Sequence, residues 1–196
     1  MAGRRHQHKR PQRQPVRRIL VVTEGLRTEP LYVEGLNRHL RSKGATAVVN
    51  PVKVGKDPLK VVEKCIEKRE AAARNDKDYD VCVCLVDVDQ HASLTAAAQL
   101  AQEENIQLLI SNLKFETWLR WHVEDKRSAL SSAQLDHLAA DLGLVTGKAL
   151  SPRFPFDAVQ SACKIARSAD PGMKPGRKGP NPSSALPILV DLMRGR

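Results

Sequence analysis

The sequence contains no apolar run long enough to cross a membrane. Its longest apolar stretches are Ile19 to Val22 and Val81 to Val86, whereas a spanning helix needs roughly 18 residues. The first residues also lack the apolar segment of a secretory signal peptide. We therefore expect a cytoplasmic protein that makes no membrane contact.

Cysteine is scarce and is not spaced for a zinc site. The chain has four cysteines, and none belongs to a CxxC pair that is matched by a second such pair. We interpret all four as reduced packing residues. Internal repeats are absent, and so is the Gly-x-x-x-x-Gly-Lys-Ser/Thr spacing of a nucleotide-binding P-loop.

The basic charge of the chain is concentrated at its two ends. The formal net charge is +10 over 196 residues, of which residues 1–18 contribute +7 and residues 164–196 contribute +5. Residues 19–163 therefore carry −2. Because residues 1–17 have almost no apolar side chains, we expect a disordered basic arm there. The arm and the C-terminal segment are candidates for nucleic-acid contact, although a basic end is also compatible with a merely solvated tail.

Apolar periodicity predicts alternating strands and helices in the first two thirds of the chain. Strands are expected at 19–22, 46–54, 79–88 and 106–110, with helices at 28–42, 57–75 and 93–104 between them. Thr28 and Asp57 are expected to cap two of the helices, Pro51 places its strand at an edge, and the strand at 79–88 is apolar on both faces and therefore central. The pattern predicts an α/β sandwich with a mainly parallel sheet.

The last third of the chain has mainly helical patterning. Helices are expected near 113–124, 131–142 and 156–169, followed by a Pro- and Gly-rich loop at 170–183 and a closing helix at 184–193. We therefore divide the chain into the arm at 1–17, an α/β domain at 18–125, and a C-terminal helical extension at 126–196 that packs on it.

Acidic side chains follow two of the buried strands. Glu24 comes after the first strand, and Asp87 and Asp89 close the strand at 79–88 with one residue between them. Residues i and i+2 of a strand share a face, and ligands of open α/β sheets bind at the carboxyl ends of the strands. If the two strands are neighbours, the three carboxylates converge on a Mg²⁺ or Mn²⁺ site. Each residue alone is compatible with a helix cap or a solvated turn.

Weaker candidates surround this predicted site. Glu116 is a candidate fourth acid, although its aromatic neighbours indicate a packing helix. His91 has the chemistry of a metal or phosphate ligand, or caps a helix, and Lys56 lies in a glycine turn before a helix, where phosphate can bind. Arg153 and Lys164 could contact substrate phosphate, but surface charge is the simpler interpretation.

The order of several motifs resembles the RloB-like proteins, which belong to the Toprim-related group. The resemblance covers about residues 18–195 and rests on ILVVTEG at 19–25, TEP at 28–30, VGKDP at 54–58, DVDQH at 87–91, SNLKFETWL at 111–119 and NPSS at 181–184. In the family the residues before Phe115 usually read Asn-Pro-Cys, whereas here Leu113 and Lys114 follow the asparagine.

The resemblance implies a Rossmann-like sheet with a Mg²⁺ site for phosphodiester chemistry, formed by Glu24, Asp87 and Asp89. It also implies a role in phage defence beside an ATPase partner. Our leading hypothesis is a metal-dependent nuclease of DNA or RNA. The main alternative is a non-catalytic nucleic-acid-binding or sensor subunit that regulates the ATPase. A sugar-nucleotide transferase that uses Asp-x-Asp with Mn²⁺ is a third.

Overall fold

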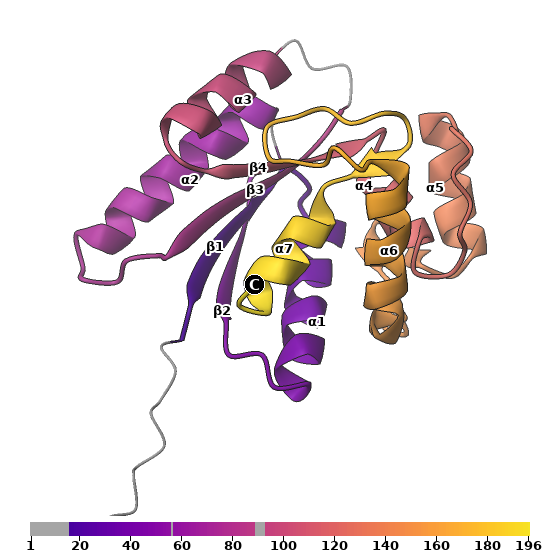
Figure 1. Ribbon diagram of the computed structural model, residues 1–196, viewed down its shortest axis with the longest axis horizontal. Coiled ribbons are helices and arrows are strands. Elements are labelled where there is room, and N and C mark those ends of the chain that lie inside the picture. The colour runs from indigo at the N-terminus through magenta and orange to yellow at the C-terminus, as the bar shows by residue number, and fades with distance from the viewer. Residues whose placement is uncertain (1–15, 56, 89–92) are drawn as a thin grey trace, which may run out of the picture.

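The apolar segments of the chain form the central sheet that their alternation predicts. A computed structural model describes residues 16–55, 57–88 and 93–196. Its main sheet has the order β2-β1-β3-β4-β7 (Figure 1). The strands are β1 (Arg18–Thr23), β2 (Val48–Lys53), β3 (Val81–Asp87), β4 (Gln107–Asn112) and β7 (Ser183–Ser184). The first four are parallel and β7 is antiparallel to β4, so the predicted α/β fold with a mainly parallel sheet is confirmed.

Helices cover both faces of this sheet (Figure 1). Their bounds are α1 (Thr28–Ser42), α2 (Pro58–Ala73), α3 (Leu94–Glu103), α4 (Phe115–Arg120), α5 (Ser132–Asp141), α6 (Val159–Ala169) and α7 (Leu186–Met193). Successive residues of β1 point to opposite faces: Ile19 and Val21 join the core of α1, α4, α6 and α7, whereas Leu20 and Val22 join that of α2 and α3. Both faces of the sheet are thus buried, as its continuous apolar strands require.

Local signals at the strand edge and at one helix start are confirmed. Pro51 lies in β2, the edge strand of the sheet, where its missing N–H costs no ladder hydrogen bond. Asp57 caps α2, because its carboxylate accepts hydrogen bonds from the backbone N–H groups of Leu59 and Lys60. The prediction that Thr28 caps α1 is wrong: Arg27 occupies the cap position, and the Thr28 hydroxyl donates to the carbonyl of Lys148 instead.

The C-terminal third contains strands that the sequence pattern did not predict. Ser183 and Ser184 form β7, which was expected to be the end of a loop and the start of a helix. A two-stranded hairpin, β5 (Val145–Thr146) and β6 (Ala149–Leu150), follows α5. Strands of two residues are too short to show the alternation of apolar and polar residues that predicts a strand. β7 is formed by its antiparallel pairing with β4. The peptide bonds Asn112–Leu113 and Asn181–Pro182 are cis.

The loop at 170–183 is held against β4 by backbone and side-chain bonds. The amide of Gly176 donates to the carbonyl of Leu108 at 2.8 Å, and the side-chain amide of Asn112 donates to the carbonyl of Gly179 at 2.9 Å. The C-terminal segment therefore contributes to the same sheet as the first strands. Across the described ranges, no helix is both long and apolar enough to span a membrane.

Several predictions fall on residues for which the structure gives no placement. Asp89, His91 and Lys56 lie outside the described residues, as do residues 1–15 of the predicted arm. At the first described positions, the Arg17 guanidinium donates to the carbonyl of Leu192 at 3.4 Å.

Candidate active site

The strands that carry the predicted acids are neighbours in the sheet. Strands β1 and β3 pair in parallel, with Thr23 opposite Leu85, and β3 pairs in parallel with β4. The carboxyl ends of the three strands therefore meet at one edge, where ligands of α/β sheets bind. The condition that we set for convergence of Glu24 and Asp87 is met.

Backbone hydrogen bonds fix Glu24 beside the end of β3. The amide of Glu24 donates to the carbonyl of Leu85 at 3.0 Å, which extends the β1–β3 ladder by one residue. In the other direction, the amide of Asp87 donates to Oε2 of Glu24 at 3.2 Å. The two candidate ligands are thus joined by a hydrogen bond between the backbone of one and the carboxylate of the other.

A cavity of about 990 Å³ opens over this edge of the sheet. Its acidic wall residues are Glu24, Glu29, Asp57, Asp87, Glu116 and Asp136. The basic ones are Arg27, Lys114 and Lys148. The hairpin β5–β6 closes one side through Val145, Gly147 and Lys148. The cavity thus has an acidic surplus.

Glu29 belongs to this cavity, and the sequence did not identify it. It lies in the first turn of α1, where an acid is expected merely to favour the helix dipole. Instead, its Oε1 accepts a hydrogen bond from the amide of Gly25 at 3.1 Å. A Cβ atom at position 25 would overlap with the Glu29 carboxyl group, so the glycine makes room for it. In the sequence, the only hint that Glu29 belongs to the site is its position four residues after Gly25, which itself follows Glu24.

Three acids of the cavity, Asp87, Glu29 and Glu116, have a raised pKa. Burial raises the pKa of Asp87 well above its usual value, and the nearby charges of Glu29, Glu116 and Glu24 raise it further. Burial, opposed in part by backbone hydrogen bonds, raises the pKa of Glu29 to about 7. The pKa of Glu116 is also raised, chiefly by burial. These carboxylates repel one another where little water can screen them.

The donor chemistry of the cavity fits a hard divalent cation. All the candidate ligands are carboxylates, the groups that Mg²⁺ and Mn²⁺ prefer, and their mutual repulsion is what such a cation relieves. Within residues 16–55, 57–88 and 93–196, however, no three His, Cys, Asp or Glu side chains stand close enough to hold one ion. Asp89, the third predicted ligand, lies beyond those ranges.

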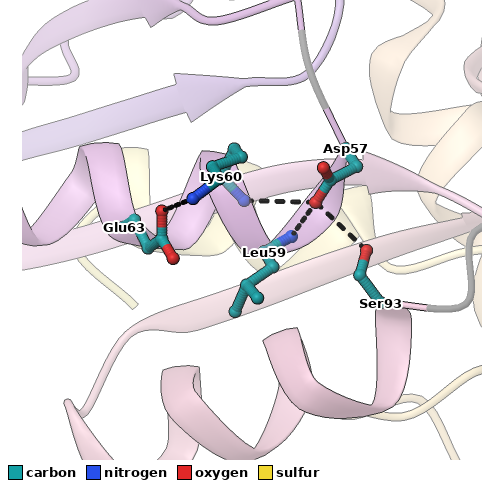
Figure 2. A network of polar contacts seen from close by, with 5 residues as sticks. All are labelled: Asp57, Leu59, Lys60, Glu63 and Ser93. Carbon is teal, nitrogen blue, oxygen red and sulfur yellow. Dashed lines mark hydrogen bonds and ion pairs between the residues drawn. The ribbon is translucent and has the colours of Figure 1, made fainter.

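Asp57 ties together two helices at the rim of the cavity. Besides capping α2, its Oδ1 accepts a hydrogen bond from the hydroxyl of Ser93 at 3.1 Å, which lies just before α3 (Figure 2). On the exposed side of α2, Lys60 pairs with Glu63 at 2.7 Å (Figure 2). Asp57 therefore holds the starts of α2 and α3 together beside the acidic edge.

The remaining basic candidates do not belong to this site. Arg153 and Lys164 are exposed, and neither lines the cavity. This agrees with their simpler interpretation as surface charge.

The fold and the cavity define an α/β protein with an acidic cleft at the carboxyl ends of parallel strands. The family model described as RloB-like protein matches residues 19–193. The chain therefore belongs to the RloB-like family. None of the curated proteins compared with the chain matched it.

Proposed function

We propose that this RloB-like protein is a metal-dependent nuclease that cleaves phosphodiester bonds of DNA or RNA. The observation that carries the proposal is the convergence of Glu24, Asp87 and Glu116 on one cavity at the carboxyl ends of the neighbouring parallel strands β1, β3 and β4. Glu29 adds a fourth acid from α1. Clustered carboxylates at such an edge favour binding of a divalent cation, and phosphodiester hydrolysis is chemistry that such a cation supports.

In this proposal Glu24, Asp87 and Asp89 hold Mg²⁺ or Mn²⁺, and Glu116 is a further catalytic acid. The cation, when bound, polarises a phosphoryl oxygen and lowers the pKa of the attacking water. Glu24 either completes this coordination or, when it is not bound to the cation, takes the proton of that water as the general base. The water oxygen bonds to phosphorus, the bond from phosphorus to one sugar oxygen breaks, and the proton ends on that sugar oxygen.

The wider biological role is proposed from the family. The RloB-like resemblance, with its link to the Toprim-related group, supports a role in anti-phage defence beside an ATPase partner. The basic residues of the arm and of residues 164–196 supply charge for holding a nucleic acid. The ends of the chain would then bind the polyanion while the acidic cleft acts on it.

The test is cleavage of labelled single- and double-stranded DNA and RNA by the purified protein, with Mg²⁺, with Mn²⁺ and with EDTA. We expect cleavage that depends on the cation and is lost in Asp87→Asn. The matched control is Asp78→Asn, an exposed aspartate near the opposite end of β3, which should cut like wild type. Circular dichroism confirms that each variant is folded.

The outcome that would contradict the proposal is a folded Asp87→Asn protein that cuts as well as wild type. Binding of nucleic acid and of Mg²⁺ without turnover, both with and without the ATPase partner, would instead identify the non-catalytic sensor subunit. Calorimetry with Mg²⁺ provides the binding measurement.

A further inference from the structure

Lys114 is the most enclosed cation among the described residues of the acidic cleft. It lies between β4 and α4, two residues before Glu116, and it lines the same cavity as Asp87. Its side chain is 19% exposed, whereas Arg27 and Lys148 in the same cavity are exposed residues. Of the described basic residues that line the cavity, Lys114 lies among the acids and Arg27 and Lys148 lie at the rim.

Among the described residues, Asp136 from the C-terminal part of the chain orients this ammonium. Lys114 Nζ lies 2.5 Å from Oδ1 of Asp136 on α5. The Asp136 side chain is 54% exposed, so the pair reaches from the cleft toward solvent. An ammonium has three N–H donors, and the bond to Asp136 uses one of them.

The charges around Lys114 keep it protonated. Burial, the largest single influence, lowers the pKa of Lys114, but the Asp136 hydrogen bond and the charges of Glu116, Asp136 and Asp87 outweigh it and raise the pKa. The ammonium therefore stays positive throughout the range in which nucleases work. It interacts with two of the acids to which the proposed function assigns chemistry, Asp87 and Glu116.

We propose that Lys114 is a further catalytic residue, whose ammonium binds the phosphate that is cleaved, and that Asp136 is the positioning residue for it. The proposal rests on the proposed nuclease function. As the phosphorus is attacked, negative charge grows on its oxygens, and a half-buried cation held in place stabilises that charge more than a mobile, fully solvated one does. The exposed Arg27 and Lys148 are suited to the flanking phosphates.

The experiment compares Lys114→Met, Lys114→Arg and Asp136→Asn with wild type. The substrate probe is bis(4-nitrophenyl) phosphate with Mn²⁺, and binding of Mg²⁺ alone is measured by calorimetry. The matched control is Lys64→Met, because Lys64 on α2 also pairs with a carboxylate, Glu67 at 2.6 Å, but lies outside the cavity.

We expect Lys114→Met to lower kcat by about 10²-fold, the usual effect of removing one group that stabilises charge in the transition state. Lys114→Arg should recover part of that loss, and Asp136→Asn should show a smaller loss. Mg²⁺ should bind Lys114→Met at least as tightly as wild type, because a competing positive charge is gone. Lys64→Met should behave like wild type.

Two results would overturn the inference while wild type is active: unchanged kcat in Lys114→Met, or a loss of Mg²⁺ binding in that variant, which would make Lys114 a structural residue of the metal site. A wild-type protein that binds Mg²⁺ but hydrolyses neither this probe nor any nucleic acid would overturn the proposed function, and the role of Lys114 with it.

Discussion

The raised pKa of Glu29 makes the stability of the metal-free protein depend on pH. In the folded chain the pKa of Glu29 is about 7, against an ordinary value of 4.5. Folding therefore favours the protonated carboxyl group, and its contribution is present in full below pH 4.5. It is lost as pH rises through 7, because ionisation of this buried carboxyl group destabilises the folded state and not the unfolded state.

The magnitude follows from the size of that shift. Raising a pKa from 4.5 to about 7 corresponds to about 3 kcal/mol of unfolding free energy, at about 1.4 kcal/mol per pKa unit. Most of this change falls between pH 5 and pH 8. The pKa values of Asp87 and Glu116 are raised as well, so their contributions have the same sign.

Glu29→Gln isolates the effect, because the amide has the same shape and does not titrate in this range. Urea unfolding in EDTA at pH 5, 6, 7 and 8 should show the variant gaining stability over wild type by about 2 to 3 kcal/mol as pH rises. The control is Glu34→Gln, an exposed glutamate of the same helix, which should run parallel to wild type. Addition of Mg²⁺ should flatten the wild-type curve.

Parallel stability curves for wild type and Glu29→Gln between pH 5 and pH 8 would refute the reasoning. They would show that the Glu29 carboxylate is solvated in the folded protein.

Three further predictions concern the surroundings of the site. Gly25→Ala should lower the urea-unfolding free energy by about 1 to 3 kcal/mol, because the new Cβ displaces the Glu29 carboxyl group; an equal cost in a Glu29→Ala background would contradict this explanation. Asp57→Ala should cost about 1 to 2 kcal/mol by removing the cap of α2, and a loss below about 0.5 kcal/mol would show that water replaces the cap. Removal of residues 1–15, which carry five basic side chains, should weaken nucleic-acid binding and reduce its salt slope by up to about four; an unchanged slope in a fluorescence-anisotropy titration would exclude the arm from binding.

The sequence was sufficient to predict that Glu24 and Asp87 lie at the ends of buried strands, whereas Asp89 lies outside the described residues. Apolar runs followed by Glu24 and closed by Asp87 indicate strands that are buried on both faces and therefore parallel, whereas their adjacency, on which the convergence depends, comes from the structure. The sequence did not identify Glu29, because an acid in the first turn of a helix has an ordinary explanation. Only the structure shows that its carboxyl group bonds to the Gly25 amide, at a position with no room for a Cβ atom.

The reason why the C-terminal wall of the site could not be predicted from the sequence is different. Asp136 meets Lys114 across 22 positions of sequence, and neither residue belongs to a motif. The β5–β6 hairpin has two residues in each strand, which is too short for alternation to be read. Contacts of this kind depend on how α5 and the hairpin pack on the sheet, which local propensity does not specify.

The two sides of the cleft come from different parts of the chain. Its acids at the sheet edge follow strands or open α1, whereas the hairpin that carries Lys148 and the α5 residue that holds Lys114 come from the C-terminal third. A hydrogen bond from the Thr28 hydroxyl to the Lys148 carbonyl at 3.2 Å joins the hairpin to the start of the helix that carries Glu29. Lys148 itself is exposed at the turn of the hairpin and is not one of the proposed cation ligands, so binding of the phosphate backbone and binding of the metal ion are separable by substitution at this position. A Lys148→Glu variant should lose affinity for nucleic acid while it binds Mg²⁺ as wild type does, and loss of both would show that the hairpin supports the acidic edge itself.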